Sequence, residues 1–522
     1  MNHFKIIFEP ENRQIIIHEG ATILEAAGQA GIILNTSCGG RGTCKKCAVH
    51  INTNNRKVLA CQYKIKSDLS VTIPIESRYF EPKILEHGIL KHTSNTDIFE
   101  KYHKIAENGK IFGAAVDIGT TTIVAKLINL ADGTILATES ILNPQTQYGD
   151  DVISRIAYAE SQEKLKILHK TIINGINDLI RKLCGISSIS SDSIYELCVV
   201  GNTAMTHIFL EFPITQLGFS PYKAHSLDAF DLPPLQLGLK INPSGNIHTV
   251  ENIAGFVGSD IISDALAADI DSTDKNTLII DIGTNGEIVL GTRENLYAAS
   301  CAAGPAFEGA RIRCGSRAAQ GAIEAVIINE NDIDYDVIGN LKAHSICGSG
   351  LIDLMAVMLE LGILDKTGRF VDFHLLKDKQ PDLIFKRLRK NDGEQAFFLT
   401  KTIFLGQSDI RQIQLAKAAI QAGIRLLLKK LNIQPGDIEQ VFLAGAFGNF
   451  IRKESALKIG ILPEIAPEKV HFIGNAAASG AQMILLSTEN RHKTRLLAKK
   501  IQYIELANSP DFQDIFADCI SF

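Results

Sequence analysis

The sequence predicts two unlike parts: a small α+β domain at the N-terminus and a larger α/β domain built by internal duplication. Three observations support this. Four of the ten cysteines fall within residues 38–61. The motif Asp-Ile-Gly-Thr occurs at 117–120 and again at 281–284, each time within a similar run of predicted elements. A chain of 522 residues is also too long for a single hydrophobic core.

The first domain is predicted to span residues 1–78, because short β-branched runs alternate there with turn residues. Its expected elements, in order, are a hairpin (4–10 and 13–20), a helix ended by glycine (22–31), a cysteine-rich loop (35–47) and two strands (48–51 and 69–76). Residues 79–110 are polar and weakly periodic, which predicts a linker with one short helix.

The second domain is expected to begin at residue 111 with three strands joined by tight turns. The same order returns in the second half of the chain, and a long amphipathic helix follows each copy, at 163–184 and 412–431. After each helix, a buried strand runs into a glycine turn. Four matched elements in matching order indicate a duplicated β-β-β-α-β-α unit. We therefore expect halves at 111–265 and 266–522.

The composition argues against two classes of function. Hydrophobic and charged fractions of 45% and 21% are typical of globular proteins, and a net charge of −5 gives no basis for nucleic-acid binding. Polar residues interrupt every apolar run before membrane-spanning length, and no signal-peptide core is present at the N-terminus. We expect a cytoplasmic protein with no membrane contact, in which ten cysteines indicate metal or redox chemistry.

The spacing C-x5-C-x2-C-x13-C predicts an iron–sulfur cluster held by Cys38, Cys44, Cys47 and Cys61. Zinc is the alternative, because C-x2-C also occurs in zinc sites, although those usually contain two such pairs. With the hairpin and helix before it, the loop resembles the 2Fe–2S ferredoxin family. That resemblance implies a ferredoxin-like (β-grasp) domain. The first spacing has five intervening residues where plant-type proteins have four, and the last is shorter than in those ferredoxins.

The two Asp-Ile-Gly-Thr turns predict a nucleotide site. Each places an aspartate at the end of a buried strand, where a turn directs N–H groups toward phosphate oxygens and the carboxylate can hold Mg²⁺ through water. With Leu-Ala-Gly-Ala-Phe-Gly at 443–448, they resemble the phosphate-1, phosphate-2 and adenosine motifs of the ASKHA superfamily, which includes sugar kinases, Hsp70 and actin. The resemblance implies a duplicated actin-like fold with RNase H-like halves and ATP between them.

The same resemblance implies which residues contact ATP and Mg²⁺. They are Asp117, Gly119, Thr120, Thr121, Thr122, Asn202, Asp281, Gly283, Thr284, Asn285, Gly445, Ala446, Phe447 and Gly448. Asp117 and Glu287 are expected to be catalytic, with Glu287 as the carboxylate that orients the attacking water.

A 2Fe–2S domain ahead of an ASKHA ATPase resembles the reductive activators of corrinoid proteins, over almost the whole chain. The resemblance includes the segments 143–156, 302–310 and 344–354, which nucleotide binding does not explain. It implies one-electron transfer from the cluster that reduces Co(II) to Co(I) on a corrinoid protein of a methyltransferase system, coupled to ATP binding and hydrolysis. An upstream electron donor is implied as well. Whether the chain forms a homodimer stays open.

Three alternatives accompany this hypothesis. An activator of 2-hydroxyacyl-CoA dehydratases is disfavoured, because those ATPases bind a 4Fe–4S cluster across a dimer and carry no fused 2Fe–2S domain. A small-molecule kinase with a redox-sensing ferredoxin domain and a non-hydrolysing nucleotide sensor are the other two. The linker 79–110 is too short for the further small domain of some corrinoid activators. Outside the cluster motif, buried structural thiols are expected at Cys184, Cys198, Cys301, Cys314 and Cys347.

Overall fold

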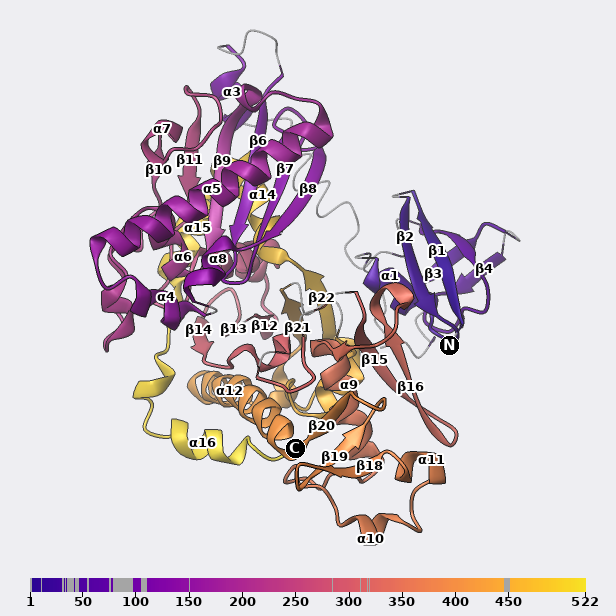
Figure 1. Cartoon of the computed structure of the whole chain (residues 1–522). Coiled ribbons are helices and arrows are strands. Elements are labelled where there is room, and N and C mark those ends of the chain that lie inside the picture. Colours follow the sequence, from indigo (N-terminus) through magenta and orange to yellow (C-terminus); the bar gives the residue numbers. More distant parts are fainter. Residues whose placement is uncertain are drawn as a thin grey trace.

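The protein has a small N-terminal domain beside a larger domain of two lobes (Figure 1). The computed structural model describes residues 2–522 except 11, 31, 33, 35–41, 43–46, 54–55, 75–76, 78–96, 105–109, 150, 284, 310, 317, 319 and 446–450.

The N-terminal domain is a mixed five-stranded sheet in the order β2-β1-β5-β3-β4. Strands β1 (His3–Glu9) and β2 (Arg13–His18) form the predicted hairpin, and β5 (Leu69–Thr72) runs parallel to β1. Helix α1 (Ile23–Gln29) places buried apolar residues in the same core as the sheet. This arrangement agrees with the predicted β-grasp domain.

Strand β3 (Ala48–Ile51) pairs antiparallel with β4 (Arg56–Leu59). The sequence analysis did not predict β4, because its short Arg-Lys-Val-Leu segment lacks an apolar periodicity of its own. Pairing with β3 is what orders it, since register in a hairpin is set by the partner strand and the turn.

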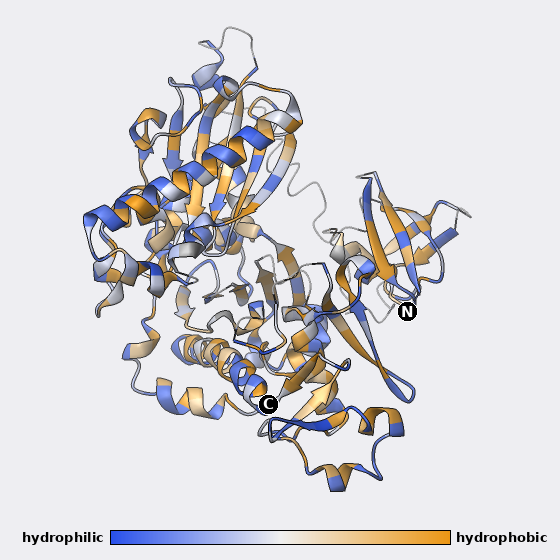
Figure 2. Ribbon diagram, in the orientation of Figure 1, coloured by the Kyte–Doolittle hydropathy of each residue, from blue (hydrophilic) through white to orange (hydrophobic). Residues whose placement is uncertain are grey.

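The first lobe contains a six-stranded sheet in the order β10-β11-β9-β6-β7-β8. Its strands are β6 (Phe112–Ile118), β7 (Thr122–Asn129), β8 (Ile135–Leu142), β9 (Ile194–Gly201), β10 (Asp231–Leu232) and β11 (Asn246–Thr249). Its helices are α4 (Val152–Tyr158), α5 (Gln162–Ser187), α6 (Thr203–Phe209) and α7 (Pro234–Leu237). The ribbon of α5 alternates between hydrophobic and hydrophilic residues, and its apolar stripe belongs to the core of this lobe (Figure 2).

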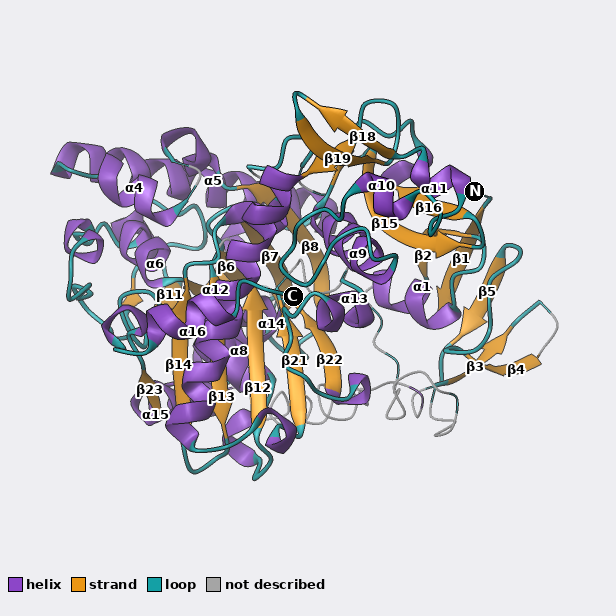
Figure 3. Ribbon diagram, turned by 90° about the horizontal axis from the view of Figure 1, so that it is seen from below, coloured by secondary structure: helices purple, strands orange, loops and turns teal. Residues whose placement is uncertain are grey.

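The second lobe repeats this plan, with the sheet order β22-β21-β12-β13-β14-β23 (Figure 3). Its strands are β12 (Thr277–Ile282), β13 (Gly286–Gly291), β14 (Leu296–Cys301), β21 (Gln440–Ala444), β22 (Val470–Gly474) and β23 (Ile501–Tyr503), and its long helix is α12 (Gln407–Leu431). In both lobes three successive strands pair antiparallel, and the strand after the long helix joins the first of them in parallel. The predicted duplication is confirmed.

The second lobe also carries segments that the sequence analysis did not predict, inserted between β14 and α12. They are β15 (Ala322–Asn329), β16 (Asp332–Val337), β17 (Ser345–Ile346), α9 (Gly348–Glu360), α10 (Phe373–Leu376), α11 (Asp382–Phe385), β18 (Leu388–Asn391), β19 (Glu394–Phe398) and β20 (Phe404–Gly406). Helices α13 (Lys453–Lys458) and α16 (Phe512–Asp518) complete the lobe. In the part of the chain that the structure describes, no helix has the length and apolarity to cross a membrane.

Two helices join the lobes. Helix α14 (Ala476–Leu486) follows β22 of the second lobe but packs against α8 (Ser259–Ala267) and against β6 and β9 of the first. The two helices approach so closely at Gly480 that a Cβ there would lie 2.2 Å from the carbonyl oxygen of Ser263. Their side chains fill a core that also includes residues of both sheets. The relative position of the lobes therefore depends on this helix pair.

The predicted linker contains one described helix, α3 (Asp97–Tyr102), which is fixed to the first lobe. The Tyr102 hydroxyl donates to Glu196 Oε2 at 2.5 Å, and Tyr102 is 2% exposed. Glu196, on β9, is fully buried and also accepts from Arg491 Nη2 at 2.7 Å. Burial beside Glu196 raises the pKa of the Tyr102 phenol above its usual range. The described helix of the predicted linker is therefore fixed to the first lobe.

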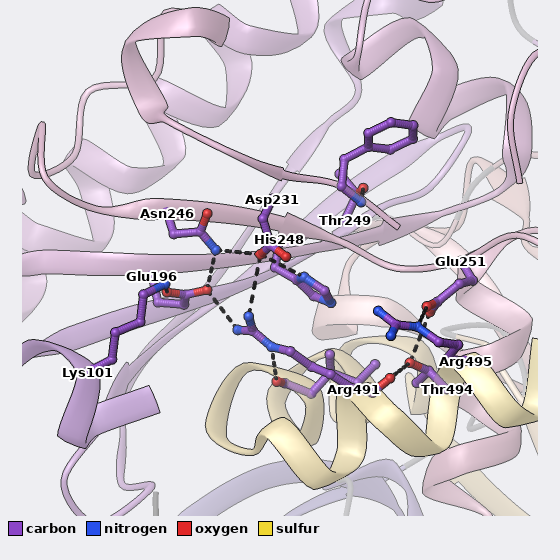
Figure 4. A network of polar contacts seen from close by, with 12 residues as sticks. Lys101, Glu196, Asp231, Asn246, His248, Thr249, Glu251, Arg491, Thr494 and Arg495 are labelled. Carbon is purple, nitrogen blue, oxygen red and sulfur yellow. Dashed lines mark hydrogen bonds and ion pairs between the residues drawn. The ribbon is translucent and has the colours of Figure 1, made fainter. Parts of the chain in front are cut away.

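Arg491 belongs to α15 (Thr488–Lys500), which lies against the first lobe (Figure 4). The guanidinium extends between Glu196 and Asp231, with Nη1 3.6 Å from Asp231 Oδ1. His248 Nδ1 lies 3.0 Å from the same Asp231 oxygen, and this contact holds the pKa of Asp231 below its usual range. One network of hydrogen bonds and ion pairs, centred on the buried Glu196, thus joins the linker, the first-lobe sheet and a C-terminal helix.

We predict that Arg491→Ala lowers the free energy of unfolding by about 3 kcal/mol, because it leaves Glu196 buried with less charge compensation. The control is Arg495→Ala, since the Arg495 side chain is 60% exposed and lies 3.4 Å from Glu251; its loss should cost at most about 1 kcal/mol. Urea unfolding of both variants tests this. Equal losses for the two would contradict the structural role of the buried pair.

Candidate functional site

The N-terminal domain brings together the two predicted cluster ligands that can be described. Cys47 immediately precedes β3 and Cys61 follows β4, so the β3–β4 hairpin returns the chain over the 13 intervening residues. Their sulfurs lie 3.3 Å apart, and both residues are buried. This explains the last spacing of the motif. Cys38 and Cys44 lie outside the described residues. The described thiol pair fits a site in which two sulfurs face one metal ion.

Residues of both lobes that were predicted to bind nucleotide line a cavity of about 430 Å³. Asp117 is the last residue but one of β6 and pairs with Val200 of β9, and Asp281 is the last residue but one of β12 and pairs with Ala444 of β21. Each aspartate therefore lies next to the residue that precedes a glycine turn, Gly201 or Gly445. At Gly445 the backbone has φ +87°, and a Cβ would lie 2.4 Å from Asp281 Oδ1, so only glycine fits there.

Most of the predicted nucleotide residues line this one cavity: Asp117, Gly119, Thr120, Thr121, Thr122 and Asn202 from the first lobe, and Asp281, Gly283, Asn285, Glu287 and Gly445 from the second. Thr284, Ala446, Phe447 and Gly448 lie outside the described residues. The structure thus brings together residues that were predicted from two distant halves of the chain. Their individual roles in nucleotide binding stay predictions.

The segment 143–156 supports the first phosphate turn from behind. Asn143 Nδ2 donates to the carbonyl of Gly119 at 2.9 Å, and Arg155 Nη2 donates to the carbonyl of Thr120. Arg155 is fully buried and its Nε donates to the carbonyl of Gly149 at 3.0 Å. On the cavity side, Asn202 Nδ2 donates to Thr120 Oγ1 at 3.0 Å. The hydrogen bonds show that this segment supports the turn 119–120, which is the first predicted phosphate turn.

Partly buried carboxyl groups of both lobes concentrate at the cavity. Burial, together with the nearby Asp281, raises the pKa of Asp117 to about 7, although hydrogen bonding from Asn475 opposes this. Burial raises the pKa of Asp281 to about 6, and burial with two neighbouring aspartates raises that of Asp260 to about 8. Asp264, just behind them on α8, is fully buried and its pKa is raised for the same reasons. Such crowding of like charges favours a bound cation or protons.

Glu287, the predicted water-orienting carboxylate, lies on β13 opposite Asp281 in register. It is 8% exposed, and Ser300 Oγ on the adjacent strand lies 3.5 Å from its Oε1. Burial, with Asp260 and Asp281 nearby, raises its pKa well above the usual range. Its environment thus favours the neutral form, which is a poor proton acceptor. The catalytic role of Glu287 stays a prediction.

Among the cavity-lining residues that were not predicted to belong to the site, five have polar or thiol side chains: Asp260, Glu308, Cys347, Ser349 and Asn475. Asn475 Nδ2 donates to Asp117 Oδ2 at 2.9 Å across 358 residues of sequence. Glu308 Oε2 accepts from Thr121 Oγ1 at 3.2 Å across 187 residues. The segments 302–310 and 344–354 were flagged only by the family resemblance, and no local pattern indicated Asn475.

The expectation of buried thiols is confirmed for Cys184, Cys198, Cys301 and Cys347, whereas Cys314 is partly exposed. Burial raises the pKa of Cys198 to about 12, so this thiol stays protonated. Cys347 differs from the others because it precedes α9 and lines the cavity.

Family comparisons divide the chain in the same way as the structure. Residues 6–66 match the 2Fe–2S iron–sulfur cluster binding domain. Residues 112–273 match the family described as the RACo middle region, and residues 275–522 match the C-terminal domain of RACo, the ASKHA domain.

Individual relatives extend this similarity over nearly the full length. The chain is 33% identical to the corrinoid activation enzyme RamQ of Eubacterium limosum, over 98% of each chain. It is 24% identical to the [Co(II) methylated amine-specific corrinoid protein] reductase of Methanosarcina barkeri, over 79% of this chain and 77% of that one. Among solved structures, a reductive activator for corrinoid, iron–sulfur protein superposes with a TM-score of 0.72 at 31% identity, covering 99% and 98% of the two chains.

We predict that Arg155→Met weakens nucleotide binding about tenfold, because the carbonyls of Thr120 and Gly149 lose a buried donor and the turn loses its support. Isothermal titration with an ATP analogue measures the effect. Arg181→Met on the exposed side of α5 is the matched control, since the Arg181 side chain is 77% exposed. Unchanged affinity in the Arg155 variant would show that the turn does not need this support.

Proposed function

The chain belongs to the family of ATP-dependent reductive activators of corrinoid proteins, and we propose that it reduces the Co(II) of a corrinoid protein to Co(I) in an ATP-coupled one-electron transfer. The observation that carries this proposal is the presence, in one chain, of a buried cysteine pair in a ferredoxin-type domain and a two-lobed acidic cavity in an ASKHA domain. The similarity to RamQ covers both parts.

The N-terminal domain is the electron carrier in this proposal. A 2Fe–2S cluster held by Cys38, Cys44, Cys47 and Cys61 would carry one electron at a time. The buried pair Cys47 and Cys61 supports this assignment, because the hairpin holds the two sulfurs together without a disulfide. The chain's own contribution is to position these thiols and to shield them, since both residues are at least 92% buried.

The nucleotide cavity supplies the energy coupling. Plant-type clusters have potentials near roughly −400 mV, and the family's reaction is uphill for such a donor. A nucleotide that binds one relative arrangement of the lobes more tightly than another shifts the protein toward that arrangement. The cavity suits this role because its two sides come from different lobes: Thr120–Thr122 from the first and Asp281–Gly283 from the second.

Mg²⁺ would accompany the nucleotide. Asp117 and Asp281 are the carboxylates that would hold it, because both line the cavity and their like charges lie close enough to favour a cation between them. Among the described residues, no three His, Cys, Asp or Glu side chains are arranged as ligands of one metal ion. The protein would therefore supply one or two carboxylates, with water and phosphate oxygens completing the shell, as is usual for nucleotide-bound Mg²⁺.

The partner is a corrinoid protein of a methyltransferase system, and an upstream donor reduces the cluster. The test uses the full-length protein with its cluster chemically reduced, MgATP and a Co(II) corrinoid protein. We expect ATP turnover to rise when the corrinoid protein is added and the Co(I) absorbance to appear only with ATP. A phosphorylated small molecule formed without cobalt reduction would overturn the proposal in favour of a kinase.

We predict that Asp117→Ala abolishes ATP-driven cobalt reduction while leaving the electron paramagnetic resonance signal of the reduced cluster intact, because Asp117 belongs to the cavity alone. Cys61→Ser should have the reverse effect: the cluster signal is lost and nucleotide binding remains. Asp132→Ala, in the exposed turn after β7, is the control for the first variant. Loss of the cluster signal in Asp117→Ala would show that the two sites are not separable.

A further inference from the structure

Glu308 lies across the cavity from the first phosphate turn. It ends the 3₁₀ turn Pro305–Glu308, which follows β14 in the second lobe. Its carboxylate accepts a hydrogen bond from Thr121 Oγ1, at 3.2 Å, and both residues line the nucleotide cavity. A carboxylate of the second lobe is thus within hydrogen-bonding distance of the turn that would hold phosphate in the first.

The backbone around Glu308 is held firmly on both sides. The preceding Phe307 is 1% exposed and belongs to the core of the second lobe, and its turn packs against α9 and α12. The following Gly309 has φ +78°, and a Cβ there would lie 2.3 Å from the carbonyl oxygen of Ser316. These constraints fix the backbone position from which the Glu308 side chain extends. A catalytic group needs such a fixed position, because it must be held in a defined geometry relative to the reacting atom.

We propose that Glu308 is the carboxylate that orients and deprotonates the water attacking the terminal phosphate of ATP. This inference rests on the proposed function. A general base must lie within hydrogen-bonding reach of its proton, directly or through one water. Phosphates held by the turn containing Thr121 would bring their terminal group to the side of the cavity where Glu308 lies, and the carboxylate would exchange its hydrogen bond from Thr121 for one from the attacking water.

The proposed step balances as follows. The water oxygen forms a bond to the terminal phosphorus while the bond from phosphorus to the bridging oxygen breaks. ADP leaves with the bridging oxygen, and the water proton passes to Glu308 Oε2 and then to solvent. The electron of the redox reaction takes no part in this step.

Glu287 is less well placed for this task. It lies on β13, opposite Asp281 within the sheet of the second lobe, and its Oε1 is 3.5 Å from Ser300 of the neighbouring strand. Glu308 instead reaches a residue of the opposite lobe. The two glutamates can be distinguished, because the same substitution is available at both positions.

The test compares Glu308→Gln with Glu287→Gln in the full-length protein. We expect Glu308→Gln to lower the single-turnover rate of ATP hydrolysis by about 10²–10⁴-fold, while the dissociation constant for MgATP changes less than about threefold. Glu330→Gln, at an exposed turn, is the control for a general effect of charge removal and should hydrolyse ATP at the wild-type rate. Glu308→Asp, which keeps the carboxylate but shortens its reach, should recover part of the lost rate.

Three results would overturn the inference. A wild-type rate in Glu308→Gln would do so, and so would a large rate loss confined to Glu287→Gln. A loss of MgATP affinity in Glu308→Gln as large as the loss of rate would show that Glu308 only holds the lobes together. If the wild-type protein hydrolyses ATP but never forms Co(I), the proposed function fails while the Glu308 result stands. If Co(I) forms and Glu308→Gln hydrolyses normally, only this inference fails.

Discussion

Two partly buried carboxylates of like charge, Asp117 of the first lobe and Asp281 of the second, face one cavity, and the architecture has to hold them there. Their mutual repulsion is greatest in a site with little water, and it raises the pKa of Asp117 in addition to the effect of burial. Two features oppose the repulsion: Asn475 donates to Asp117, and the tight packing of α14 on α8 at Gly480 holds the lobes together. Asn475 is also the N-cap of α14. The helix that joins the lobes therefore begins at the residue whose side-chain amide donates to the Asp117 carboxylate.

The duplication explains why the two lobes contribute similar turns to this site. The two copies have since diverged, and their corresponding turns now have different contacts. In each copy a 3₁₀ turn that starts with proline follows the third strand: Pro144–Tyr148 after β8 and Pro305–Glu308 after β14. In the first copy, Asn143 and Arg155 near this turn support the phosphate turn of their own lobe. In the second copy, the corresponding turn carries Glu308 to the opposite lobe. One ancestral element thus supports a loop in one half and presents a carboxylate in the other.

The features that could be predicted from the sequence are those formed by residues that lie close together in the chain. The cysteine spacing, the two Asp-Ile-Gly-Thr turns and the long amphipathic helices are local patterns, and the confirmed duplication followed from their order. Asn475 and Glu308 could not be found this way, because their partners lie 358 and 187 residues away and only packing brings them together. Strand β4 was missed for a related reason, since its polar residues are ordered by pairing with β3. The inserted segments between β14 and α12 repeat nothing in the first copy.

The ferredoxin-type domain is joined to the two lobes at different points. The helix α3 of its linker is fixed by Tyr102 to Glu196 on β9 of the first lobe. Its first strand meets the second lobe, where His3 Nε2 contacts Asp336 on β16. A rotation between the lobes changes the distance between these two attachments, so the cysteine pair must move relative to at least one lobe. β9 ends at Gly201, and the next residue, Asn202, lines the cavity, so the strand that anchors the linker is also one that would sense the nucleotide. Preferential binding of ATP to one lobe arrangement would therefore also select where the electron carrier lies.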